Sequence, residues 1–121
     1  MPAVVEITNI TEYVDAVNQK IESGERFIAY MTGSVIDGKC WCFYCDKFRD
    51  TINKNILNDT KLTVLKGLIP TKEEWVGVKT HPWKTHPLLK AKGAPGILLI
   101  EGNQVLIRAD DDDEIENDEY L

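Results

Sequence analysis

The strongest constraint on this chain is the six-residue run from Cys40 to Cys45, which reads C-W-C-F-Y-C and holds all three cysteines. A mostly apolar segment, Phe27 to Met31, precedes this run and is typical of a central strand covered on both faces. An apolar stripe at helical spacing follows it, formed by Cys45, Phe48, Ile52 and Ile56. We therefore expect the cysteines to lie between a strand and a helix, with Cys42 near the helix start.

This placement gives Cys42 and Cys45 a chemical meaning. Unpaired backbone N–H groups and the macrodipole at a helix N-terminus favour a thiolate, and the thiolate is the attacking species in disulfide exchange. A second thiol one helical turn later can then close a small disulfide. In a chain of this kind C-x-x-C indicates a redox pair, although two ordinary helical thiols are the alternative. Cys40 lies outside the pair, as a bystander or as the partner in an alternative disulfide under oxidation.

The cysteine count also indicates the compartment. Three clustered cysteines do not form a secreted disulfide framework, and no N-terminal apolar run is flanked by basic residues. We therefore expect a cytoplasmic protein. Apolar stretches such as Ile97 to Ile100 are of strand length and too short to span a bilayer, so no membrane partner is expected.

The net charge of −6 belongs largely to one end of the chain. The segment from Ala109 to Leu121 holds eight acidic residues and no Lys or Arg. We divide the chain into one domain, 1–108, and an acidic tail, 109–121. No basic stripe indicates nucleic acid binding.

The order of apolar runs and turn residues predicts an α/β fold. Thr11 is a candidate N-cap, Gly24 a helix stop, and Gly102 with Asn103 a hairpin turn. The early strands can pair in parallel through helical crossovers, and the final hairpin makes the sheet mixed. The expected segments are a strand at Ala3–Ile7, a helix at Thr11–Ser23, a loop at Thr32–Lys39, a strand from Leu62, a loop at Pro70–Thr85, a short helix at Pro87–Lys92, and strands at Gly96–Ile100 and Val105–Ile107.

Two other kinds of site have partial support in the sequence. His81 and His86 have an acceptable spacing for a zinc ligand pair, but 35 residues separate Cys45 from His81, and a solvated histidine is the default in a loop. Gly33 to Cys40 reads G-x-x-x-x-G-K-C, close to a phosphate-binding loop, yet Cys40 replaces the hydroxyl that magnesium needs. We expect no metal site.

With these residues placed, the chain resembles the thioredoxin-like family of thioredoxin domain-containing protein 17, also called Clot or thioredoxin-related proteins. The resemblance extends over most of the chain, in the same order and at similar spacing. It rests on Thr32-Gly33-Ser34, Gly38-Lys39, Trp41-Cys42-x-x-Cys45, Trp75, His81-Pro82-Trp83-Lys84 and Lys90-Ala91-Lys92-Gly93-Ala94-Pro95.

The resemblance implies a thioredoxin-like fold, with a central mixed β-sheet flanked by helices, and a monomeric protein-disulfide reductase. Cys42 would be the nucleophile and Cys45 the resolving thiol. No cofactor would be bound, because electrons would come from NADPH by way of a thioredoxin reductase. The substrates would be disulfide-containing proteins or small molecules, contacted by Trp41, Phe43, Tyr44, Ala94 and a cis Pro95. The loop with Trp75 and Trp83 would be an insertion beside the active site.

Two departures from the family bear on the chemistry. The family usually has Pro and then Asp between the cysteines, whereas this chain has Phe43 and Tyr44, so a carboxylate that would oppose the Cys42 thiolate is missing. Ordinary thioredoxins also place a buried carboxylate on the strand before the motif, and Phe27 to Met31 contains none. The alternative function is a non-catalytic thioredoxin-like interaction module.

Overall fold

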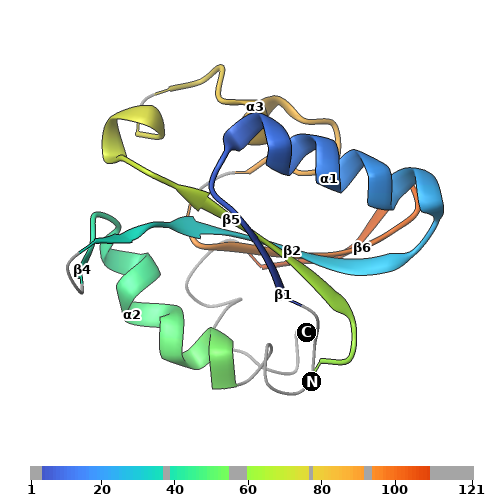
Figure 1. The fold of residues 1–121 in the computed structure, drawn as a ribbon, viewed down its shortest axis with the longest axis horizontal. Coiled ribbons are helices and arrows are strands. Elements are labelled where there is room, and N and C mark those ends of the chain that lie inside the picture. Colours follow the sequence, from blue (N-terminus) through green and yellow to red (C-terminus); the bar gives the residue numbers. More distant parts are fainter. Residues whose placement is uncertain (1–3, 37–38, 55–59, 77, 92–93, 110–121) are drawn as a thin grey trace.

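The computed structural model describes residues 4–36, 39–54, 60–76, 78–91 and 94–109. One sheet runs through the middle of the molecule (Figure 1). Helices α1 (Ile10–Ser23) and α3 (Pro82–Thr85) cover one face, and α2 (Phe43–Ile52) covers the other. The predicted α/β fold, a mixed sheet flanked by helices, is therefore confirmed. Among the described residues, no helix is both long and apolar enough to cross a membrane.

The five-stranded sheet has the order β1-β5-β2-β6-β7. Strands β1, β5 and β2 run parallel, whereas β6 is antiparallel to β2 and to β7. This is the mixed pairing expected from helical crossovers followed by a hairpin. The strands are Val4–Ile7 (β1), Arg26–Gly33 (β2), Thr63–Ile69 (β5), Gly96–Glu101 (β6) and Gln104–Ala109 (β7).

The central strand β2 explains why its sequence is apolar without alternation. Phe27, Ala29 and Met31 belong to the core on the α1 side of the sheet, and Ile28 and Tyr30 belong to the core on the α2 side. Successive strand residues point to opposite faces, so a strand covered on both sides must be apolar throughout. The strand that leads to the cysteines is therefore packed on both of its faces.

The first helix begins earlier than the sequence predicted. Asn9, not Thr11, is the N-cap, and its side chain accepts a hydrogen bond from the backbone N–H of Glu12 at 3.0 Å. Asn is at least as good an N-cap as Thr, and with this cap α1 begins at Ile10 rather than at Thr11. Gly24 ends the helix as predicted, with φ of 76° in the left-handed region.

The expected loop at Thr32–Lys39 is wrong in its described part. Strand β2 continues to Gly33 because β5 extends alongside it to Ile69, whose carbonyl also accepts from the Ser34 N–H at 3.0 Å. A two-stranded hairpin follows, in which β3 (Val35–Ile36) pairs with β4 (Lys39–Cys40). The described part of the segment that resembled a phosphate-binding loop thus contains the end of β2 and the paired strands β3 and β4, and α2 begins only at Phe43.

The region after β5 is more ordered than the predicted loop. It contains a 3-10 helix, η2 (Lys72–Glu74), as well as α3. The short helix expected at Pro87–Lys92 is wrong in its described part, where residues 87–89 form a turn, and the helix α3 lies earlier in the chain. Pro82 occupies the first helical position, where its missing N–H costs nothing, and this fixes the helix start.

Candidate active site

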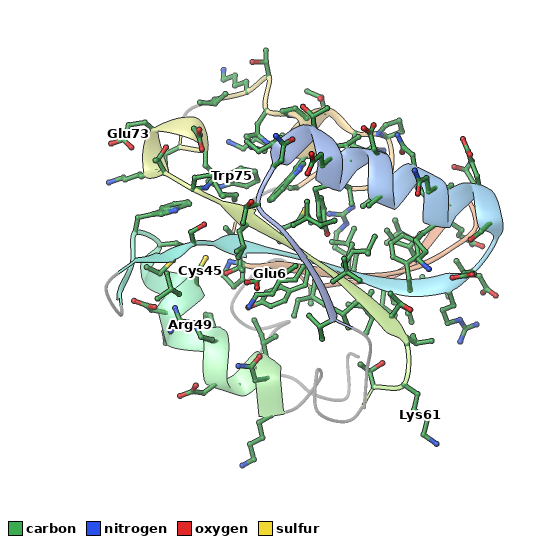
Figure 2. All side chains as sticks on the ribbon, viewed as in Figure 1. Glu6, Cys45, Arg49, Lys61, Glu73 and Trp75 are labelled. Atoms are coloured by element: carbon green, nitrogen blue, oxygen red, sulfur yellow. The ribbon has the colours of Figure 1, made fainter. Side chains whose placement is uncertain are left out.

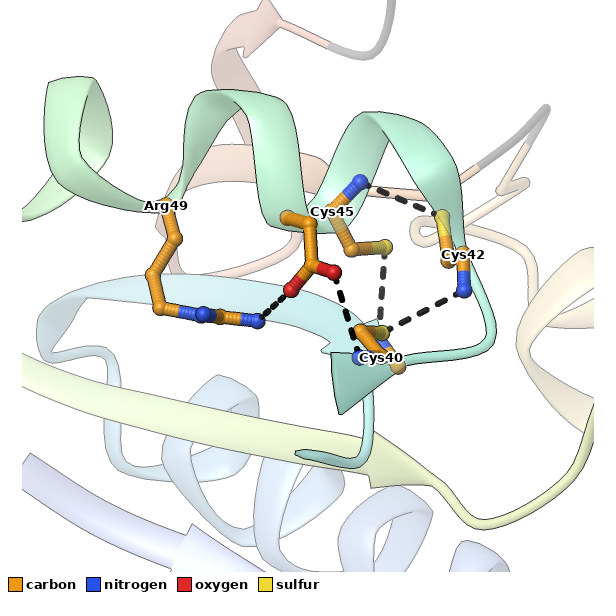
Figure 3. A network of polar contacts seen from close by, with 6 residues as sticks. Cys40, Cys42, Cys45 and Arg49 are labelled. Atoms are coloured by element: carbon orange, nitrogen blue, oxygen red, sulfur yellow. Dashed lines mark hydrogen bonds and ion pairs between the residues drawn. The ribbon is translucent and has the colours of Figure 1, made fainter. Parts of the chain in front are cut away.

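Cys42 is the N-cap residue of α2. Its Sγ accepts a hydrogen bond from the backbone N–H of Cys45 at 3.2 Å (Figure 3). The cap sulfur thus satisfies one of the N–H groups that a helix start leaves unpaired. It also lies at the positive end of the helix dipole, so an anionic sulfur is favoured there. Cys42 is buried, with 8% of its surface exposed.

Cys45 lies one turn into α2 and is fully packed, with 1% of its surface exposed. Its Sγ accepts a hydrogen bond from the Gly33 N–H at 3.3 Å, at the end of β2. Its thiol is also hydrogen-bonded to the side chains of Cys42 and Thr32. The hydrogen bond to Cys42, followed by burial, raises the pKa of the Cys45 thiol. The two thiols are therefore adjacent, and the inner one keeps its proton.

The segment before β6 faces the outer cysteine. The Ala94–Pro95 peptide bond is cis, as the resemblance implied. The Cys42 thiol donates to the carbonyl oxygen of Ala94 at 3.4 Å. The structure thus brings Cys42, Cys45 and Ala94 together from α2 and from the loop that precedes β6.

Trp41 packs against the core and also borders a cavity. Its indole ring is partly buried against the core, and its Nε1 donates to the carbonyl of Ile69 at 2.9 Å. The same residue lines a cavity of about 470 Å³ beside the cysteines. The other residues that line this cavity are Ser34, Cys40, Pro70, Thr71, Lys72 and Glu73.

Cys40 belongs to the same polar network (Figure 3). Its backbone N–H donates to Oδ2 of Asp46 at 3.2 Å, and Asp46 forms an ion pair with Arg49. The hydrogen bond from Cys40 is the main reason that the pKa of Asp46 is lowered. The Sγ of Cys40 accepts from the Cys42 N–H at 3.4 Å, and burial raises the pKa of this thiol.

Two functional positions were missed from sequence. Thr32 lies in the segment expected to be a loop, yet it is buried with 5% exposure and reaches Cys45. Gly33 donates its N–H to the same sulfur. No contact with the cysteines was predicted for either residue. The available signal in the sequence was Thr32 itself, a polar residue that directly follows the apolar strand segment preceding the cysteines. The side chains of Phe43 and Tyr44 lie outside the described part of the structure, so their contacts stay predictions.

The region with the two tryptophans packs on the other face of the sheet. In Figure 2, Cys45 points from α2 toward the sheet, whereas Trp75 lies on the opposite side of the sheet. Trp75 and Trp83 are buried in the α1-side core, and Nε1 of Trp83 donates to the Ile10 carbonyl at 3.3 Å. Lys84 donates from Nζ to the Trp75 carbonyl at 2.6 Å. The region between β5 and β6 is thus anchored to the core by Trp75 and Trp83.

The expectation of solvated histidines is wrong. His81 and His86 are 3% and 8% exposed, and the ring of each accepts hydrogen bonds from N–H groups of the turn that it begins. Nδ1 of His81 accepts from the Trp83 N–H, and Nδ1 of His86 accepts from the N–H groups of Leu88 and Leu89. Within the described ranges, no three His, Cys, Asp or Glu residues are grouped so as to hold a metal ion.

Comparison with known proteins agrees with this geometry. The model of a family described as thioredoxin domain-containing protein 17-like, thioredoxin domain, matches residues 6–120. A search of curated protein sequences gives no match.

Solved structures of thioredoxins share the fold. Oxidised thioredoxin O2 from Arabidopsis thaliana aligns over 91% of this chain and 84% of its own, with 15% identity and a TM-score of 0.59. Thioredoxin NaTrxh from Nicotiana alata aligns over 96% of this chain and 90% of its own, with 16% identity and a TM-score of 0.58.

Proposed function

Because this chain belongs to the thioredoxin domain family of the thioredoxin domain-containing protein 17-like proteins, we propose that it is a thiol–disulfide oxidoreductase that reduces disulfides of proteins or small molecules. The observation that carries this proposal is the position of Cys42. Its sulfur caps α2 and accepts the Cys45 N–H at 3.2 Å, beside a second thiol. Capping by a sulfur anion favours the form that attacks disulfides.

In the first step, the Cys42 thiolate attacks one sulfur of the substrate disulfide. A bond forms between Cys42 and that sulfur, the substrate S–S bond breaks, and the other substrate sulfur leaves as a thiolate. The Ala94 carbonyl, 3.4 Å from the Cys42 sulfur, belongs to a backbone segment that can pair with an extended substrate. Trp41, Phe43, Tyr44, Ala94 and Pro95 are the proposed contact residues.

In the second step, Cys45 attacks the Cys42 sulfur and releases the reduced substrate. The raised pKa of Cys45 supports this order of events, because its largest cause is the hydrogen bond to Cys42. Once Cys42 is held in a mixed disulfide, its sulfur is a much weaker hydrogen-bond acceptor, so this cause is reduced. Cys45 can then lose its proton at the moment when its thiolate is needed.

Thr32 is the proposed first group on the route of that proton. Its side chain is hydrogen-bonded to Cys45 and to Tyr30. Thr32 and Tyr30 also line a cavity of about 290 Å³ together with Glu6, Arg49 and Lys66. A hydroxyl can accept one proton while it donates another, so this cavity offers a path to solvent in place of the missing buried carboxylate.

The proposed source of electrons is NADPH through a thioredoxin reductase, with no cofactor bound to this chain. The test is reduction of insulin or cystine, followed as NADPH consumption with reductase present. We expect turnover by the native protein, none by Cys42→Ser, and a trapped mixed disulfide with Cys45→Ser. NADPH consumption no faster than in the reductase blank would contradict the proposal and favour the non-catalytic interaction module.

A further inference from the structure

The third cysteine, Cys40, lies in direct contact with both cysteines of the redox pair. The sulfur of Cys45 accepts the Gly33 N–H at 3.3 Å, and a Cβ atom added to Gly33 would meet the sulfur of Cys40 at 2.7 Å. Both sulfurs therefore gather around one glycine at the end of β2. A side-chain hydrogen bond joins the thiols of Cys40 and Cys45. Cys45 thus has a thiol neighbour on each side.

The backbone keeps Cys40 in this position. Strand β4 is tied to α2 because Oδ2 of Asp46 accepts the Cys40 N–H at 3.2 Å, and Asp46 is itself paired with Arg49. On the opposite side, Cys40 pairs with Val35 of β3. The sulfur of Cys40 also accepts the N–H of Cys42 at 3.4 Å. These contacts hold Cys40 against the same helical turn that carries the redox pair.

Cys40 also differs from Cys45 in its access to solvent. Cys45 is 1% exposed, whereas Cys40 is only partly buried and lines the cavity of about 470 Å³ with Trp41 and Lys72. The Cys40 proton can leave through this cavity without passing the redox pair.

We propose that Cys40 is a second disulfide partner for Cys45, so that the oxidised protein interconverts between a Cys42–Cys45 and a Cys40–Cys45 disulfide. The exchange needs no further oxidant. The Cys40 thiol loses its proton to solvent, and its thiolate attacks the Cys45 sulfur. The Cys40–Cys45 bond forms, the Cys42–Cys45 bond breaks, and Cys42 leaves as a thiolate.

The exchange gives the oxidised protein a distinct property. In the Cys40–Cys45 form the nucleophile Cys42 is a reduced thiol, while its resolving thiol is held in the disulfide. A Cys42 thiolate that then attacks a second disulfide keeps that partner as a mixed disulfide, because Cys45 cannot release it. This inference rests on the proposed function only for the formation of the Cys42–Cys45 disulfide by substrate.

The pairing can be tested without turnover. Purified Cys42→Ser, reduced and then treated with one equivalent of the thiol oxidant diamide, is expected to lose both free thiols while staying monomeric on a non-reducing gel. Cys40→Ser/Cys42→Ser is the matched control and is expected to keep its thiol or to dimerise. Retained thiols or a dimer in Cys42→Ser would overturn the pairing, whether or not the native protein is a reductase.

The exchange is tested in the native sequence. Protein oxidised by one equivalent of cystine is alkylated with N-ethylmaleimide, digested and mapped by mass spectrometry. We expect the label to be divided between Cys40 and Cys42. A label on Cys40 alone would overturn the exchange. Failure of the proposed function has a different signature, namely no NADPH-dependent turnover.

Discussion

The backbone N–H of Gly33 donates to the sulfur of Cys45 at 3.3 Å, so the end of the central strand holds the inner thiol of the proposed redox pair. Gly33 also allows the close approach of its neighbours. Its missing Cβ leaves the space that Cys40 and the Trp41 ring occupy. The positions of Cys45, Cys40 and the Trp41 ring therefore all depend on one residue without a side chain.

Gly33→Ala is expected to destabilise the fold by overpacking. The new methyl group would lie 2.7 Å from the Cys40 sulfur and 3.0 Å from the Trp41 ring, closer than non-bonded atoms normally approach. Relief requires displacement of both side chains, at a cost of about 1–3 kcal/mol in the free energy of unfolding. Urea denaturation measures the change. Ser34→Ala is the control for the same segment, and an equal stability of the two variants would contradict the steric explanation.

Thr32→Val is expected to slow resolution of the mixed disulfide. The Thr32 hydrogen bond lowers the pKa of Cys45, against the larger effects of Cys42 and burial, so its loss leaves the thiol harder to deprotonate. Loss of one net hydrogen bond of ~1 kcal/mol corresponds to roughly a fivefold slower step. The decay rate of a Cys42 mixed disulfide can be measured by stopped flow at a series of pH values. We expect the pH profile of this rate to shift toward higher pH.

The control for Thr32→Val is Thr8→Val, which removes an exposed hydroxyl from the rim of the same cavity. We expect the decay rate of this variant to match that of the native protein. If both variants were equally slow, the effect would belong to the cavity rather than to the contact with Cys45.

Tyr44→Asp is expected to slow alkylation of Cys42 at neutral pH by a few-fold. The substitution restores the carboxylate that the family usually carries before the second cysteine, and a nearby negative charge disfavours a thiolate. Iodoacetamide labelling of Cys42 followed by peptide mass spectrometry gives the rate. Tyr44→Asn separates charge from loss of the ring. A rate that is unchanged or faster in Tyr44→Asp than in Tyr44→Asn would refute the charge argument.

The stability of the fold is expected to fall as the pH drops below the ordinary histidine range. Burial lowers the pKa of His81 and of His86 from 6.5 in the folded state, so the unfolded chain binds more protons there. Stability is therefore complete above about pH 6.5 and decreases as the pH falls through the lower, folded-state pKa values. Urea unfolding between pH 7.5 and 5.5 tests this.

The double variant His81→Asn/His86→Asn is the control for the acid effect. Asn has a side-chain oxygen that can accept from the same turn N–H groups but does not titrate. We expect its unfolding free energy to change less over this pH range. An equal loss in the native protein and in the double variant would assign the acid sensitivity to other groups.

Much of this architecture follows from local sequence patterns. The apolar segment at Phe27, the helical stripe at Phe48 and Ile52, and the stop at Gly24 each depend on residues close together in the chain. For the same reason the position of Cys42 at the start of a helix could be predicted. Patterns of this kind report burial and turn geometry, which neighbouring residues determine.

The tertiary structure decided what depends on distant partners. β2 continues through Thr32 and Gly33 because Ile69 of β5 lies beside it, and only this pairing brings Thr32 to Cys45. His86 is buried beside a distant residue, Asn18, whose Oδ1 lies 2.8 Å from Nε2 of His86, whereas His81 packs edge-on against the rings of Trp75 and Trp83. The spacing of Cys42 and Cys45 in the sequence was sufficient to predict the Cys-x-x-Cys pair. The place of Cys40 beside it required hydrogen bonds between a hairpin and a helix, which no local pattern encodes.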